Sequence, residues 1–168
     1  MIVSNATPLL HLARAGLLDL LPKLYTKVIV PASVWEEVMG RGEPRPEAQV
    51  LRAVVDAWLE VRNPSAQERR MSEALRRGAP VGRGEADAIA LAEALKCTLL
   101  MDDRVAIDLA RMRGVETRWT TSTVLEAHRR GILNRAAARR AIEDLVASGL
   151  WIRQDVLLRL LSILAEEY

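Results

Sequence analysis

Acidic or amide side chains occur at four places where a short apolar run or a loop passes into an expected helix. They are Asn5, Glu36 and Glu37, Glu85 and Asp87, and Asp102 and Asp103. In an open α/β sheet, ligands bind outside the carboxyl ends of the strands, so side chains at those ends meet although they are far apart in sequence. Clustered carboxylates repel one another, and a fold tolerates them mainly when a divalent cation neutralises them. The pattern therefore predicts a metal site.

Hard oxygen ligands without a cysteine or histidine pair favour Mg²⁺ or Mn²⁺, which would bind a phosphate oxygen and help to ionise an attacking water. His11 lies in a mostly apolar segment and His128 beside two arginines, so each is expected to have a structural or surface role. Each acid also has a simpler explanation. Glu37 suits a solvated helix surface, Asp87 a helix dipole and Asp103 an N-cap. Their recurrence at successive helix starts favours the metal site.

Length and composition indicate one cytoplasmic domain. The chain has 168 residues, of which 50% are hydrophobic, and this is enough for a sizeable core. No apolar stretch approaches the roughly 18 residues of a membrane span, and the N-terminal residues lack a signal-peptide pattern. The single cysteine, Cys97, excludes an intramolecular disulfide and is expected to be a small buried residue.

Arginine carries nearly all of the positive charge, since lysine occurs only at Lys23, Lys27 and Lys96. Guanidinium groups bind phosphate at two points, so the arginines would suit a nucleic-acid track, although solvated helix faces explain them equally well. The arginines in question are Arg69, Arg70, Arg76, Arg77, Arg83, Arg129, Arg130, Arg139 and Arg140. Aromatic residues make up only 4% of the chain, which argues against a sequence-reading protein that stacks bases on an RRM-type aromatic platform.

Apolar strand-like runs alternate with helical patterns along the chain. We expect strands at 1–4, 28–30, 59–61, 98–101 and 115–119, and loops at 40–46 and 78–84. Helices are expected to open at Thr7, Ser33 and Gly84, and to span 47–58, 65–77, 104–113, 122–130, 134–148 and 154–166. Strands joined by helical crossovers predict a three-layer α/β/α fold with a central, mainly parallel sheet. We expect a single domain, 1–168, in which 134–168 form C-terminal helices packed on the rest.

Four segments resemble, in order and spacing, the successive motifs of PIN-domain proteins. They are residues 2–10, 30–38, 84–92 and 99–104. Residues 120–131 are similar to a prokaryotic PIN branch named DUF3368, so the resemblance covers almost the whole chain. It implies a PIN-like α/β/α fold and a Mg²⁺- or Mn²⁺-dependent ribonuclease, often the toxin of a toxin-antitoxin pair.

The resemblance also implies a role for individual residues. It assigns the catalytic, metal-binding positions to Asn5, Glu37, Asp87 and Asp103, and accessory positions to Glu85, Asp102, Thr7 and Thr120. Asn5 falls where the family has its first aspartate. Trp119 and Ser122 stand where many relatives have glycine, and the bulky Trp119 would narrow or reshape the cleft.

The amide at Asn5 leaves two functions open. Its carbonyl oxygen can ligate a cation but brings no charge, so metal affinity and the ionisation of bound water would both weaken. The first function is a metal-dependent endoribonuclease using Glu37, Asp87 and Asp103, with arginines along the cleft. The second is a catalytically degenerate PIN-like module that binds RNA or a protein partner without cleaving. A phosphoacceptor receiver domain is less favoured, because paired acids after the first strand and a clear lysine after the last are missing.

Two apolar faces near the C-terminus are candidate contact surfaces for a protein partner. The faces comprise a leucine stripe at Leu157, Leu160, Leu161 and Leu164 and an alanine-rich face at Ala136, Ala137 and Ala141. They would suit a homodimer or an antitoxin helix, and intramolecular packing explains them equally well.

Overall fold

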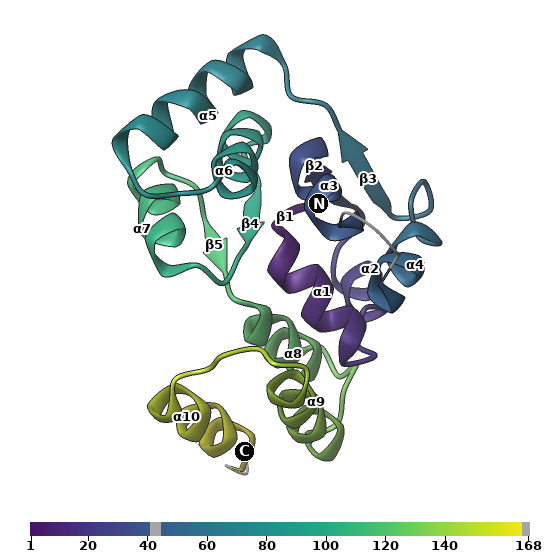
Figure 1. Cartoon of the computed structure of the whole chain (residues 1–168). Coiled ribbons are helices and arrows are strands. Elements are labelled where there is room, and N and C mark those ends of the chain that lie inside the picture. Colours follow the sequence, from purple (N-terminus) through teal and green to yellow (C-terminus); the bar gives the residue numbers. More distant parts are fainter. Residues whose placement is uncertain (41–44, 166–168) are drawn as a thin grey trace.

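The computed structural model describes residues 1–40 and 45–165, and its strands form a five-stranded parallel sheet in the order β3-β2-β1-β4-β5 (Figure 1). The strands are β1 (Ile2–Ser4), β2 (Val28–Pro31), β3 (Leu59–Arg62), β4 (Thr98–Leu100) and β5 (Thr117–Arg118). The strand order reverses at β1: β2 and β3 lie on one side of it, and β4 and β5 lie on the other. Ligands bind at such a switch point in open α/β sheets. A receiver domain instead places its first strand between the second and third, so this order excludes that alternative.

Helices cover both faces of the sheet and complete the predicted three layers (Figure 1). One core joins the sheet to α1 (Ala6–Arg14), α2 (Leu20–Leu24), α3 (Ala32–Met39), α4 (Pro46–Arg52), α8 (Thr120–Arg129), α9 (Arg135–Ala147) and α10 (Gln154–Ala165). The other core joins it to α5 (Ala66–Gly78), α6 (Arg83–Leu95) and α7 (Arg104–Met112).

Alternation along the strands separates these two cores. Ile2 points into the first core and its neighbour Val3 into the second, and both are fully buried. Leu100 and Leu99 repeat the division on β4. Successive side chains of a strand point to opposite faces, so a strand covered on both sides must be apolar throughout. The short apolar runs of the sequence meet that requirement.

Several element boundaries differ from the sequence-based expectation. Helix α1 begins at Ala6 with Asn5 as its N-cap, so Thr7 and Pro8 both lie within its first turn. Helix α4 ends at Arg52, whereas the apolar spacing predicted a helix to residue 58; the chain turns there, with Asp56 at a positive φ of 66°. Helix α8 starts at Thr120, two residues early. Parts of the predicted 40–46 loop and residue 166 lie outside the described residues.

The C-terminal helices pack on the rest of the chain. Helix α9 contacts α8 and α1, and α10 contacts α9. Leu160 and Leu164 of α10 are buried in the first core, so the leucine stripe faces the chain's own interior. The other side of α10 leaves Leu158 exposed. Among residues 1–40 and 45–165, no helix is both long enough and apolar enough to cross a membrane.

Candidate functional site

The end of β1 places an unpaired oxygen inside the protein. The Asn5 N–H donates to the carbonyl of Leu100 at 3.0 Å, which continues the pairing of β1 with β4. Only 3% of Asn5 is exposed. Its side chain makes no capping bond to α1, and Oδ1 is buried without a hydrogen-bond partner among the described residues. Buried polar atoms are normally hydrogen-bonded, so this oxygen is available to a donor or a cation.

A glutamate from α3 reaches the same point. A Cβ added at Gly84 of α6 would lie 3.0 Å from Glu37 Oε2 and 3.6 Å from Asn5 Oδ1. The amide oxygen and the carboxylate therefore converge on the backbone at Gly84, and the glycine leaves room for both. Residue 84 is buried, so a larger side chain there would have to displace one of these oxygens.

Glu37 is poised to hold a positive ion or a proton. The residue is exposed as a whole, but its carboxylate lies against α6, and this partial burial raises its pKa. The charge of Glu85, in the first turn of α6, raises the same pKa further. A cation placed near the two carboxylates would oppose both effects.

Asp87 is tied to its surroundings by two partners. The Ser33 hydroxyl donates to Asp87 Oδ2, and the Arg83 guanidinium lies 3.6 Å from the same oxygen. Arg83 also approaches Glu36 Oε2 at 4.0 Å. Ser33 faces Asp87 and Glu37 faces Gly84, so α3 and α6 run antiparallel where they meet. Only 7% of Asp87 is exposed, and its carboxylate is held in one orientation.

Asp102 joins the ends of two strands. It follows β4, and its carboxylate accepts the Thr120 N–H at 2.9 Å and the Thr120 hydroxyl at 2.6 Å. Burial raises the pKa of Asp102, while the bonds from Thr120 and the charge of His11 act in the opposite direction. The first N–H of α8 is thus satisfied by a residue 18 positions earlier in the sequence.

The remaining predicted residues lie around this edge of the sheet. Asp103 is exposed and caps α7, accepting the Ala106 N–H at 2.7 Å. Thr7 lies half-buried in α1. The structure therefore brings Asn5 and Glu37 together, with Glu85 close enough to act on Glu37. Within residues 1–40 and 45–165, no three histidine, cysteine, aspartate or glutamate side chains gather closely enough to hold a metal ion.

Ser33 and Gly84 were not foreseen as part of the site, and Arg83 was foreseen only as one of the arginines of a nucleic-acid track. Ser33 precedes Glu37 by one helical turn, and Arg83 precedes Asp87 by one turn. The i, i+4 spacing was a usable signal, because residues four apart lie on the same helix face. Gly84 carried no comparable signal, since its role depends on how α3 meets α6.

Both histidines make hydrogen bonds that support the fold. His128 Nδ1 donates to the Leu133 carbonyl, 3.0 Å away. His11 Nδ1 lies 2.9 Å from Ser148 Oγ, and that hydroxyl donates to the Leu145 carbonyl at 2.6 Å. The serine proton is engaged, so His11 is the donor to Ser148.

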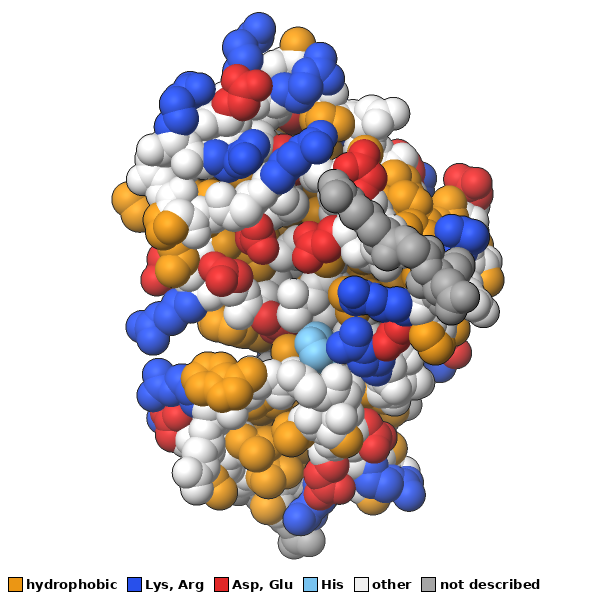
Figure 2. Space-filling model, in the orientation of Figure 1, with side chains coloured by type: hydrophobic (Ala, Val, Ile, Leu, Met, Phe, Trp, Pro, Cys, Tyr) orange, Lys and Arg blue, Asp and Glu red, His pale blue; other side chains and the backbone are white. Residues whose placement is uncertain are grey.

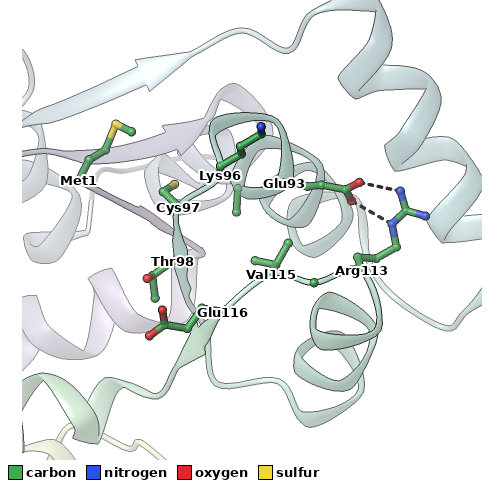
Figure 3. A pocket seen from close by; sticks show the side chains of 10 residues that line it. Met1, Glu93, Lys96, Cys97, Thr98, Arg113, Val115 and Glu116 are labelled. Atoms are coloured by element: carbon green, nitrogen blue, oxygen red, sulfur yellow. Dashed lines mark hydrogen bonds and ion pairs between the residues drawn. The ribbon is translucent and has the colours of Figure 1, made fainter.

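A pocket of about 590 Å³ lies at the opposite, amino-terminal edge of the sheet (Figure 3). Met1, Cys97 and Glu116, which precede β1, β4 and β5, line it. Figure 3 shows Arg113 paired with Glu93 through two bonds, of 2.8 and 2.9 Å. The pocket is separate from the acidic edge and contributes no residue to the site built above.

A family model described as a PIN domain, DUF3368, matches residues 1–166. This chain belongs to the PIN-domain family. No curated protein matches the sequence. The match confirms the resemblance seen in the sequence motifs, and the parallel α/β/α architecture of this PIN domain agrees with it.

PIN domains generally use divalent metal ions, and the donors of this PIN domain suit a hard cation. The buried Asn5 oxygen has no hydrogen-bond partner in the part of the chain that the structure describes, and Glu37 supplies a carboxylate at the same place. Two features weaken the fit to a cation. The Asn5 amide brings no negative charge, and the Asp102 carboxylate already accepts two hydrogen bonds from Thr120.

Acidic and basic side chains occupy different parts of the surface near the site. Figure 2 shows acidic side chains gathered across the middle of the face drawn, with lysine and arginine side chains above them and on both sides. Helix α5 contributes four exposed arginines, Arg69, Arg70, Arg76 and Arg77, and none forms an ion pair with another described residue. Basic groups beside an acidic centre suit a polyanion whose phosphate is bound at the centre.

Proposed function

We propose that this PIN domain is an endoribonuclease that depends on Mg²⁺ or Mn²⁺, weakened by an amide at its first ligand position, and that it acts as the toxin of a toxin-antitoxin pair. The convergence of Asn5 Oδ1 and Glu37 Oε2 at Gly84 is the observation that carries the proposal. A buried oxygen that has no hydrogen-bond partner among the described residues and a carboxylate lie together at the end of β1, the switch point of the sheet, which supports the proposal.

In this proposal the cation is held by Asn5, Glu37, Asp87 and Asp103, and its binding draws together carboxylates that do not gather closely enough without it in the described residues. A divalent ion there would supply a binding position for a phosphate oxygen and a lowered pKa for a bound water. Ser33 keeps the Asp87 carboxylate in one orientation, while Arg83 shields part of its charge until substrate arrives. Asp103 already accepts a helix N–H through Oδ1, which leaves Oδ2 for the ion.

Arginines position the RNA backbone in this proposal. Arg83 is exposed and lies between Glu36 and Asp87 at the mouth of the site. Its guanidinium can exchange these weak contacts, at 4.0 and 3.6 Å, for a phosphate bound at two points. The arginines of α5 extend the basic surface away from the acids.

A second function, a module that binds RNA or a protein partner without cutting, is favoured by one specific observation. Within the described residues the acids do not form a metal-holding group of three, and Asn5 adds no charge to those that are near. Such a module would keep the basic surface and would not bind the cation.

A cation titration followed by a cleavage assay separates the two functions. We expect Mn²⁺ to raise the melting temperature of the wild-type protein modestly and to support slow RNA cleavage. Asn5→Asp should bind Mn²⁺ about tenfold more tightly or better, because a full charge is added within a few ångströms of a dication. Asn5→Ala serves as the matched control and should abolish both effects. If Asn5→Asp neither binds Mn²⁺ more tightly nor cleaves faster, the non-cleaving function is the correct one.

A protein partner would contact the exposed side of the C-terminal helices. Val156, Leu158 and Ile163 of α10 are exposed while the leucine stripe packs inward. An antitoxin helix or a second copy of the chain would bury this side. Co-expression with a candidate antitoxin and measurement of the mass in solution test both forms of partnership.

A further inference from the structure

We propose that Trp119 and Trp151 form a binding site for unpaired nucleobases beside the acidic edge of the sheet. The site would hold a single RNA strand by stacking its bases on the indoles while the arginines contact its phosphates. This inference rests on the proposed function, because it concerns the bases that flank the phosphate bound at the acids.

The exposure of these two side chains is the first observation. The chain has four tryptophans, and 37% of Trp119 and 82% of Trp151 are exposed. Trp35 and Trp58 are instead partly buried against the first core. An indole left in water forgoes a large gain from burial, so an exposed one next to a functional site suits a ligand with a flat apolar face.

The backbone of Trp119 is fixed at the site. Trp119 is the N-cap residue of α8 and follows directly on β5. The next residue, Thr120, is fully buried and gives both its N–H and its hydroxyl to Asp102. The indole therefore projects from the carboxyl end of β5, on the same edge of the sheet as Asn5 and Asp102.

Trp151 is brought to this edge by a contact between distant parts of the chain. It lies in the connection from α9 to α10, between the buried Leu150 and the half-buried Ile152. Two residues before Leu150, Ser148 accepts the His11 Nδ1 proton at 2.9 Å.

His11 connects that segment with the helix that follows Asn5. A Cβ added at Gly149 would lie 3.9 Å from His11 Cε1, so the α9–α10 connection lies against the histidine ring. His11 belongs to α1, which begins directly after Asn5. The α9–α10 connection that carries Trp151 is thus held against α1, the helix that begins after Asn5, while Trp119 is held through Thr120 to Asp102.

Charge around the two indoles favours RNA over a protein helix. The exposed Arg104 follows Asp103 at this edge and forms no ion pair with another described residue. Arg118 precedes Trp119 and Arg153 follows Trp151 by two residues, but they pair with Glu116 at 3.3 Å and with Asp155 at 2.9 Å, so a phosphate would have to replace these surface contacts. Figure 2 shows a notch at the left of the face drawn, with lysine or arginine side chains on both lips and a broad hydrophobic side chain on the lower one. Aromatic faces interleaved with guanidinium groups are the pattern by which proteins bind single strands without reading their sequence.

Binding measured without cleavage tests the site. The full chain in EDTA is titrated with two probes, a short unstructured oligoribonucleotide and inorganic polyphosphate, which offers phosphates but no bases. We expect Trp119→Ala and Trp151→Ala each to weaken RNA affinity about five- to a hundredfold and to leave polyphosphate affinity unchanged. RNA should quench the indole fluorescence of the wild type, and each variant should show less of that quenching. Met112→Ala is the control, since 84% of Met112 is exposed at the far end of α7.

The variants Trp119→Phe and Trp151→Phe show whether a loss of RNA affinity in the alanine variants comes from the missing aromatic ring or from loss of folding. Each keeps an aromatic face and should bind RNA more tightly than the alanine variant. The inference is overturned if the alanine variants bind RNA like the wild type, or if their RNA and polyphosphate affinities fall equally. It is also overturned if they alter only the oligomeric state, which would mark a protein contact. If RNA binding depends on the tryptophans but neither the wild type nor Asn5→Asp cleaves RNA, the nuclease proposal is contradicted and the proposed nucleobase site is still supported.

Discussion

Thr120 gives both of its hydrogen-bond donors to the carboxylate of Asp102, its N–H to Oδ1 at 2.9 Å and its hydroxyl to Oδ2 at 2.6 Å. The pair closes the gap between the end of β4 and the start of α8. It also fixes one rotamer of a half-buried carboxylate at the switch point of the sheet. Asp102 therefore stabilises the acidic edge of the sheet, and only the lone pairs that Thr120 does not use remain for a ligand.

Loss of the Thr120 hydroxyl should therefore be costly. Thr120→Val keeps the shape of the side chain but leaves a half-buried carboxylate oxygen with one donor fewer, and we expect the unfolding free energy to fall by about 1–3 kcal/mol. Thr123→Val is the matched control. Thr123 is fully buried in the same helix, and its hydroxyl has no partner among the described residues, so this change should be neutral or stabilising. Urea denaturation compares the two; equal losses would contradict the role given to the Asp102 pair.

Thr120→Val should also change how the stability of the protein depends on pH. Burial raises the pKa of Asp102 in the folded protein, and the Thr120 bonds hold that rise in check. A raised folded pKa means that the folded state binds the proton more tightly, so stability falls as pH rises from the unfolded value, near 3.8, through the folded one. Thr120→Val should extend this loss to higher pH. Unfolding free energies measured across the acidic range would show the longer decline, and an unchanged profile would count against it.

The sequence indicated where the site would form better than what each residue would do there. Placing Asn5, Glu37 and Asp102 on one edge needs only strand ends, which apolar runs reveal. The convergence at Gly84 depends on the antiparallel packing of α3 with α6, a tertiary relation that no local pattern encodes. The pairing of Asp102 with Thr120 likewise joins residues 18 positions apart. The low aromatic content predicted no base-stacking platform, and composition alone could not reveal that Trp119 and Trp151 remain exposed.

Removing the Glu37 charge should stabilise the protein while weakening its response to cations. Burial and the charge of Glu85 raise the pKa of Glu37, so the ionised carboxylate is a cost that appears as pH rises through the folded value. In EDTA at neutral pH, Glu37→Gln should melt at a higher temperature than the wild type. With Mg²⁺ or Mn²⁺ added, its melting temperature should rise less. Glu36→Gln alters the exposed neighbour and should change neither quantity appreciably; a cation response preserved in Glu37→Gln would exclude Glu37 as a ligand.

Gly84→Ala should separate stability from ligand binding. Alanine favours a helix by about 1 kcal/mol over glycine, but a Cβ at residue 84 would lie 3.0 Å from Glu37 Oε2 and would push that carboxylate away from Asn5. We expect the melting temperature to change little and the Mn²⁺-induced rise to disappear. Gly78→Ala offers the control, because an added Cβ there meets no atom within 4 Å. Calorimetric titration with Mn²⁺ measures the difference, and undiminished affinity in Gly84→Ala would place the ion elsewhere.

The end of α5 should contribute to RNA affinity through charge alone. Arg76 and Arg77 lie in its last turn, and a short loop carries the chain from there to Arg83 and the acids at the start of α6. If both bind phosphates, replacing them with alanine should weaken RNA binding for all sequences alike. On a single strand, the slope of log affinity against log salt should become shallower by about 0.7 for each phosphate that an arginine no longer neutralises.

The paired change of Arg139 and Arg140 to alanine is the control for that measurement. It removes the same charge from α9, where Arg139 is already paired with Glu143 at 3.1 Å. Net charge is altered equally in the two double variants, so a general electrostatic effect would shift both slopes together. A shallower slope confined to the α5 variant would place the RNA backbone across the turn that leads into the site, whereas matching slopes would remove α5 from its path.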